Sequence, residues 1–142
     1  MAYLECSNNQ IESLILPDES LALVEIHCTG NKIETLSITA DNVLRSLRCN
    51  SNFLTELHLQ CPVLEYLDCD HNALDQLDIN ALPALTELIC SYNRINSLEW
   101  GTENGLKKLH CNSNALKMLD ISTLPSLVDL QCDGNPLQYL DI

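Results

Sequence analysis

A single pattern of about 21 residues repeats along the whole chain. Its cysteines stand 20 to 22 residues apart, at Cys6, Cys28, Cys49, Cys69, Cys90, Cys111 and Cys132. An asparagine follows each cysteine by three residues, and a leucine or isoleucine precedes each by two. Large apolar residues recur five, eight and ten positions later, all of them aliphatic except Trp100. The unit LxxLxCxxNxLxxLxI thus occurs seven times, which predicts a stack of similar coils.

The alternation inside each unit predicts β-structure. Leu-x-Cys places two side chains on one side of a strand, because successive residues of a strand face opposite ways. Seven such strands are expected to lie parallel, about 4.8 Å apart. A second alternation, as in Leu77-Asp78-Ile79, predicts a short extended segment on the opposite wall of each coil. Prolines predict turns at 82–85 and 124–127, and no window of ten residues has helical periodicity.

These columns resemble the leucine-rich repeats, in the short form of about 21 residues found in bacterial cysteine-ladder proteins such as internalins. The stretch 64–79 shows the resemblance best, and it extends over essentially the whole chain. The resemblance implies a leucine-rich repeat solenoid with a parallel β-sheet on the concave face, short extended or turn segments on the convex face and little helix. It also implies a binding scaffold, often in bacterial surface or host-directed proteins, although repeat scaffolds carry many unrelated roles.

The length and the net charge of the chain limit its domain organisation and its possible partners. The 142 residues fit one domain, 1–142, of seven repeats without evident caps. A net charge of −13 argues against nucleic-acid or anionic-membrane binding, and no apolar run approaches the ~18 residues that a membrane span needs. Both end coils are expected to expose core residues. A fragment of a longer chain, end-to-end self-association and a frayed terminal coil all remain open as explanations.

The cysteine column is interpreted as a row of small buried apolar side chains. Free cysteine is among the most buried residue types, and burial raises the thiol pKa. Parallel side chains suit disulfide geometry poorly, and a metal site needs convergent ligands. Cys61, the eighth cysteine, precedes Pro62 as Leu82 and Leu124 precede their prolines, so it is expected to replace a core leucine. The sharper alternative is a catalytic thiol at Cys61.

The asparagine column is predicted to be buried and hydrogen-bonded. An amide side chain at the bend after each strand can bond backbone groups of adjacent coils.

The outward positions vary from coil to coil, whereas the inward positions do not, so the outward ones are available for a partner. An exposed isoleucine beside tyrosines and an arginine has the makeup of a binding hot spot. The predicted partner-binding residues, near the middle of the concave face, are Arg48, Tyr66, Asp68, Ile89, Tyr92 and His110. The competing interpretation is that scattered exposed apolar residues are ordinary.

Histidines and carboxylates suggest a second class of function. His27 and His110 are four coils apart, about 19 Å, which excludes shared metal ligation. Asp68, Asp70 and His71 could form a weak cation site or serve an enzyme, but a solvated polar cluster is the simpler interpretation. No cofactor-binding motif is found, since the four glycines form no phosphate loop.

The partner is expected to be a protein, with a basic surface as the favoured form. Only Arg48 and Lys108 are basic on the concave rows. The acidic residues there are Glu5, Glu25, Asp68, Asp70, Glu87, Asp129 and Asp133. Free thiols and the lack of an N-terminal export signal predict a cytoplasmic location, bacterial or, for a translocated effector, in the host cytosol. A surface or secreted location would follow if the chain is a fragment of a longer protein.

Overall fold

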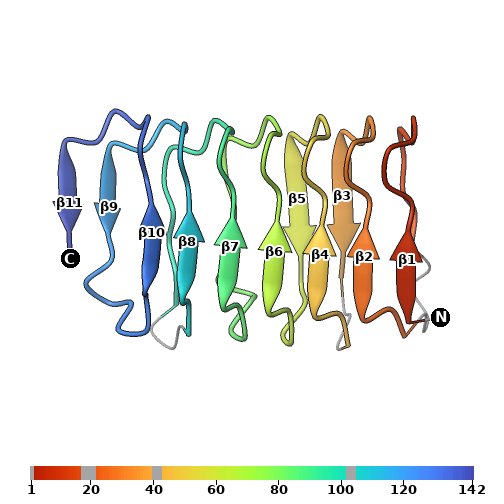
Figure 1. Cartoon of the computed structure of the whole chain (residues 1–142), viewed down its shortest axis with the longest axis horizontal. Helices are drawn as coiled ribbons and strands as arrows, with labels where there is room; N and C mark the ends of the chain where they lie inside the picture. The colour runs from red at the N-terminus through yellow and green to blue at the C-terminus, as the bar shows by residue number, and fades with distance from the viewer. Residues whose placement is uncertain (1, 17–21, 40–42, 102–104) are drawn as a thin grey trace.

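The computed structural model describes residues 2–16, 22–39, 43–101 and 105–142, and these form a β-solenoid. One wall is a parallel sheet in the order β1-β2-β4-β6-β7-β8-β10 (Figure 1). Its strands are β1 (Tyr3–Glu5), β2 (Glu25–His27), β4 (Ser46–Arg48), β6 (Tyr66–Asp68), β7 (Glu87–Ile89), β8 (Lys108–His110) and β10 (Asp129–Gln131). The described residues contain no helix, and their parallel sheet with short strands on the opposite wall is the predicted solenoid architecture.

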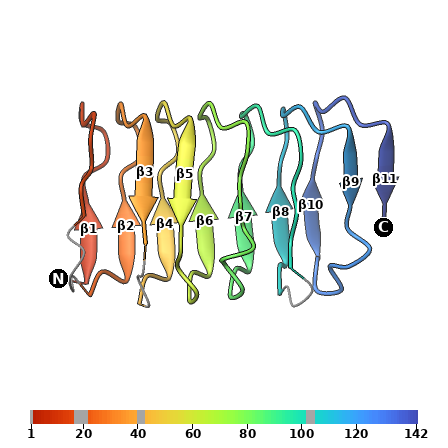
Figure 2. The ribbon, with the colours of Figure 1, turned by 180° about the vertical axis from the view of Figure 1, so that it is seen from behind.

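The strands of the opposite wall run the other way (Figure 2). β3 (Thr35–Ile38) pairs with β5 (Glu56–Leu59), and β9 (Met118–Asp120) pairs with β11 (Tyr139–Asp141). The segment 77–79, the example used for this prediction, is not a strand in the structure. The predicted turns are present, since the Leu85 and Leu127 amides donate to the Leu82 and Leu124 carbonyls at 3.1 Å.

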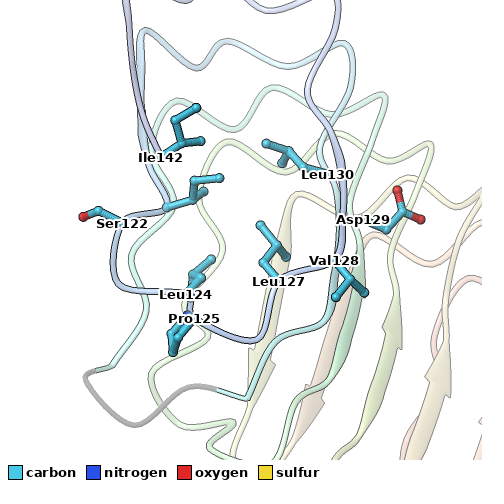
Figure 3. Close-up of a pocket in the computed structure, with 9 residues that line it drawn as sticks. Ser122, Leu124, Pro125, Leu127, Val128, Asp129, Leu130 and Ile142 are labelled. Carbon is cyan, nitrogen blue, oxygen red and sulfur yellow. The ribbon is translucent and has the colours of Figure 1, made fainter.

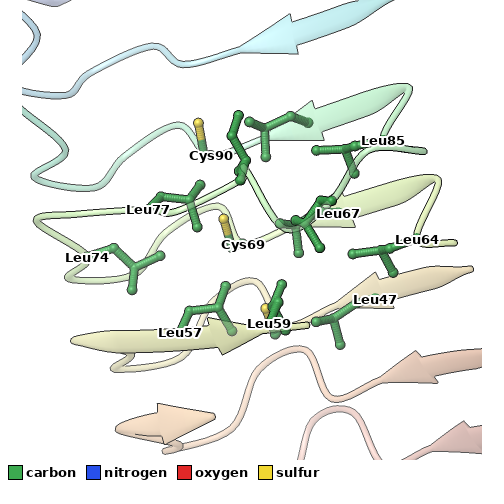
Figure 4. Close-up of a cluster of buried hydrophobic side chains, with 14 of the residues drawn as sticks. Leu47, Leu57, Leu59, Leu64, Leu67, Cys69, Leu74, Leu77, Leu85 and Cys90 are labelled. Atoms are coloured by element: carbon green, nitrogen blue, oxygen red, sulfur yellow. The ribbon is translucent and has the colours of Figure 1, made fainter. Parts of the chain in front are cut away.

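The register of the main sheet follows the sequence repeat. Leu47 pairs with Leu67 and Leu67 with Leu88, so equal positions of the unit stand side by side. Their side chains fill the space between the two walls together with the cysteines (Figure 4). Cys61 is fully buried there, at the position predicted for a core leucine. Because each coil contributes the same apolar columns, the core is a continuous stack.

The asparagine ladder joins neighbouring coils. Asn31 and Asn52 are buried, but Asn9 is exposed and the other four lie between these extremes, so the predicted burial holds only in part. The hydrogen bonding is as predicted: the amides of residues 11, 33, 54, 74, 95 and 116 each donate to the asparagine Oδ1 of the next coil at 2.9–3.1 Å. Each bend after a strand is therefore fixed by side-chain bonds that only an amide can supply.

Core residues are accessible at both end coils, as the sequence predicts. Leu4 and Cys6 at one end, and Leu130 at the other, are only partly buried. The last coil borders an opening of about 440 Å³ whose lining includes Leu124 and Ile142 (Figure 3).

Candidate protein-binding face

The outward side of the main sheet, with the two residues that follow each cysteine, is here called the sheet face. Arg48, Asp68, Ile89 and His110 lie in one row across β4, β6, β7 and β8, because each is paired with the next in register. Adjacent members of such a row are about 4.8 Å apart. The structure thus brings together four of the six predicted partner-binding residues in a line, with Tyr66 in the neighbouring row of the same sheet.

Tyr66 is already in contact with an arginine of its own chain. The guanidinium carbon of Arg48 lies 5.0 Å from the centre of the Tyr66 ring, a cation–π distance. Tyr66 is half-buried, and burial is the main cause that raises the pKa of its hydroxyl. The sequence placed both residues on the face but did not indicate that they cover each other.

Asp68 is a half-buried carboxylate in the middle of the row. Its Oδ1 accepts a hydrogen bond from the Asp70 amide at 3.2 Å, and burial, followed by the charge of Asp70, raises its pKa. Within the described residues no basic nitrogen lies within 4.0 Å of its oxygens. Asp68 therefore keeps capacity to accept a cationic donor from outside.

The other charged groups near the centre are paired within the chain. His110 Nε2 lies 2.9 Å from Asp129 Oδ2, and Lys108 Nζ lies 3.4 Å from Glu87 Oε2. Since Arg48 lies on Tyr66, both basic residues of the sheet face already have partners of their own.

A separate cluster of polar side chains lies on the first two coils. The Tyr3 ring meets the His27 ring edge to face at 5.1 Å, and Tyr3 donates to Glu5 Oε2 at 2.8 Å. Hydrogen bonds from Ser7 and Tyr3 lower the pKa of Glu5 to about 2. His27 Nε2 is buried without a hydrogen bond among the described residues and lies 3.6 Å from Glu25.

The second residue after every ladder cysteine is in the left-handed backbone region. Its φ lies between 51° and 69° in all seven coils, at Asn8, Gly30, Ser51, His71, Tyr92, Ser113 and Gly134. The side chains of this row vary from coil to coil as predicted, but the sequence analysis did not indicate that all seven share a left-handed backbone. A residue with a Cβ atom costs about 1–2 kcal/mol in this region, least for asparagine. The two glycines and the asparagine of the row were the sequence signal that could have revealed it.

Two bulky residues occupy this costly row in adjacent coils. The His71 and Tyr92 rings are stacked, with centres 4.3 Å apart and planes 25° from parallel. Tyr92 is 53% exposed, and His71 Nδ1 lies 3.0 Å from Asp70 Oδ2. In the cluster of Asp68, Asp70 and His71, which the sequence suggested as a cation or enzyme site, Asp70 and His71 are thus in direct contact. Asp68 is linked to them by the hydrogen bond from the Asp70 amide.

The thiols have the environment of core side chains. Burial raises the pKa of Cys28 and Cys111 to about 12, and it also raises the pKa of Cys49, Cys69 and Cys90. The structure describes all eight cysteines, and none of them is in a disulfide. Cys61 Sγ lies 3.7 Å from the Ile38 carbonyl oxygen, deep in the core. Buried thiols of this kind are poor nucleophiles.

Among the described residues, no group of three or more histidine, cysteine, aspartate or glutamate side chains could hold a metal ion. Over the same residues, no helix is long and apolar enough to cross a bilayer.

Comparison with solved structures identifies the architecture. The functional domain of InlJ from Listeria monocytogenes, described as including a cysteine ladder, has a TM-score of 0.84 and 24% identity, covering 100% of this chain and 39% of its own. YopM from Yersinia enterocolitica has a TM-score of 0.88 and 28% identity, covering 100% and 31%. A leucine-rich repeat protein of Leptospira interrogans has a TM-score of 0.71 and 25% identity, covering 83% and 36%. No protein-family model matches the sequence, and no curated protein does.

The fold defines the chain as a leucine-rich repeat solenoid. Its short repeats and its buried sulfur column give it a cysteine-ladder architecture like that of the InlJ domain. It spans between about a third and two fifths of the length of the neighbours named above.

Proposed function

We propose that this chain is a non-enzymatic scaffold that binds a protein partner on its sheet face. One observation carries the proposal: the ladders fix the inward residues of every coil, while the outward row of the sheet changes from Arg48 to Asp68 to Ile89 to His110 in consecutive strands. Packing does not require such variety, whereas recognition of an irregular protein surface does. The leucine-rich repeat neighbours support the same class of function.

The partner is proposed to present a basic surface. The seven acidic residues of the sheet face outnumber its two basic ones, and those two are occupied by Tyr66 and Glu87. An acidic surface speeds encounter with a basic partner, and this effect weakens as salt is added.

Site-specific photo-crosslinking tests the binding face. A benzophenone amino acid is placed at Ile89 in β7 and, as the matched control, at His58 in β5 on the opposite wall. We expect the Ile89 position alone to give a discrete crosslinked protein in bacterial or host-cell lysate. In the same experiment, Tyr66→Ala with Arg48→Ala should remove that product while the far-UV circular dichroism spectrum stays unchanged. The proposal is contradicted if Ile89 and His58 give the same crosslinked products, or if Ile89 gives no crosslinked product.

The finer biological setting is also a proposal. Neighbours from Listeria, Yersinia and Leptospira support a bacterial protein, and a host-directed role is its sharper form. The crosslinks from bacterial and host lysates, run side by side, decide between the two settings. The free thiols support a reducing compartment, and localisation of the tagged full-length protein in fractionated cells tests this.

An enzyme using Cys61 or the Asp68/Asp70/His71 cluster is the competing class. Titration of the native protein with a thiol reagent separates the two classes. The scaffold predicts that the buried thiols react only after unfolding, whereas one fast thiol of low pKa would favour an enzyme.

A further inference from the structure

The stacked rings of His71 and Tyr92 form an exposed aromatic surface with no structural requirement behind it. The same position in the five other coils holds asparagine, serine or glycine, which the left-handed backbone accepts more readily. Tyr92 is 53% exposed, so its ring is not retained to fill the core.

The stack leaves its two outer faces open within its own row. The ring separation of 4.3 Å is close to the ~4.8 Å spacing of strands, so the rings are stacked along the solenoid axis. The next residues of the row on either side are Ser51 and Ser113, whose side chains are too small to cover a ring. A further planar group can therefore extend the stack.

Carboxylates lie beside the stack. Asp70 Oδ2 is 3.0 Å from His71 Nδ1, and the Asp70 amide bonds Asp68 Oδ1 at 3.2 Å. Among the described residues Asp68 has no ion-pair partner within 4.0 Å. The site thus combines a flat aromatic surface with negative charge.

We propose that His71 and Tyr92, with Asp70 and Asp68 beside them, bind an arginine side chain of the protein partner. A guanidinium group is planar, stacks on aromatic rings and donates paired hydrogen bonds to carboxylates, whereas an ammonium group lacks the planar shape. The chain itself makes such a contact where Arg48 lies on Tyr66. This inference rests on the proposed function and deepens it, since it names what the partner inserts.

The test is an NMR titration of the full chain with N-acetyl-arginine methylamide. We expect saturable shifts of the His71 and Tyr92 signals. The citrulline analogue, which keeps the shape without the charge, and the lysine analogue should each bind about fivefold or more weakly. Equal shifts with citrulline, or no saturable shift with arginine, overturn the proposal. Saturable shifts with methyl glucoside and none with arginine would also overturn it, in favour of a sugar site.

Two matched variants distinguish a loss of the arginine site from a loss of the folded structure. Tyr92→Ser introduces the residue that Ser51 and Ser113 already provide at this backbone position, so the coil is expected to stay folded. It should abolish the arginine-specific shifts at His71. Tyr139→Ser is the control, because Tyr139 is 54% exposed and its hydroxyl donates to Asp141 at 3.2 Å, but no ring of the described residues is stacked on it. Equal loss in both variants contradicts the assignment.

Failure of this proposal differs from failure of the proposed function. If the Ile89 crosslink forms and Tyr92→Ser leaves both its yield and the arginine shifts unchanged, only the arginine site is wrong. If arginine binds at Tyr92 but no crosslink forms from the sheet face, the arginine site stands and the scaffold proposal is wrong.

Discussion

Replacing Asn52 with alanine tests how far the asparagine ladder holds the solenoid together. Asn52 is 6% exposed and its side chain makes bonds to two coils. Its Oδ1 accepts from the Ile33 amide at 3.1 Å, and its Nδ2 donates to the Cys28 and Cys49 carbonyls, both at 3.0 Å. All of these groups lie where water cannot replace the lost partner.

The cost follows from which groups lose their last bond. The Cys28 carbonyl still accepts from Asn31 at 2.9 Å, and the Cys49 carbonyl from Asn72 at 3.1 Å. The Ile33 amide alone loses its last partner, and leaving it unpaired costs about 1–3 kcal/mol. Each of the two carbonyls loses one hydrogen bond but keeps another, which adds about 0.5–1.5 kcal/mol for each. We therefore expect Asn52→Ala to lower the free energy of unfolding by roughly 2–6 kcal/mol, a large part of the ~5–15 kcal/mol of an ordinary domain.

Urea unfolding followed by circular dichroism measures the loss, with Asn9→Ala as the control. Asn9 is exposed and bonds only the Cys6 and Ser7 carbonyls of its own coil, at 2.9 and 3.1 Å. Since Asn31 also donates to the Cys6 carbonyl, Asn9→Ala should cost less than about 1 kcal/mol. Equal losses in the two variants would refute the reasoning, because burial and the bond between coils would then contribute nothing.

Three further predictions concern the thiols, the left-handed row and the core. Buried thiols keep their protons in the folded state, so stability is complete below the unfolded thiol pKa of about 8.5 and falls by about 1.4 kcal/mol per thiol and pH unit above it. For Cys28 and Cys111, whose folded pKa is about 12, this loss of stability continues up to about pH 12. We therefore expect circular dichroism to show unfolding near pH 10. A fold that is intact at about pH 11 would contradict this prediction. Gly30→Ala should cost about 1–3 kcal/mol, because φ is +66° and the new Cβ would lie 2.7 Å from Asn8 Oδ1, whereas Gly101→Ala, with nothing within 4 Å, should be nearly neutral. Leu67→Ala should cost about 2–5 kcal/mol in urea unfolding and Val128→Ala, 86% exposed, almost none; similar values would disprove the assignment of the core.

The sequence predicted the register of the main sheet because the repeat period sets which residues of neighbouring coils lie side by side. Each coil contacts only its neighbours, so a period of about 21 residues fixes which residues pair, as Leu47, Leu67 and Leu88 do. The same period predicts that Cys61 lies in the core, as it does, because its position before Pro62 matches that of two leucines before their prolines. Binary patterning was sufficient for these features, since burial depends mainly on which face a residue occupies.

The candidate site was predictable only as a list of outward residues. Arg48, Asp68, Ile89 and His110 are in one row, as the spacing implied, but the cover of Arg48 over Tyr66 depends on side-chain conformations that no spacing specifies. The contact between His71 and Tyr92 was missed for a different reason. A left-handed residue turns its side chain away from the strand alternation on which the sequence argument relied.

The sequence by itself determined the period, the parallel strands, the column of core thiols, the hydrogen-bonded amide column and the acidic outer surface. Those features depend on which residue types recur at which interval, and interval alone decides position in a stack of coils. The tertiary structure decided which outward groups contact each other, as Tyr92 does with His71. That choice rests on backbone angles and on contacts between neighbouring coils, and both exist only once the chain has folded.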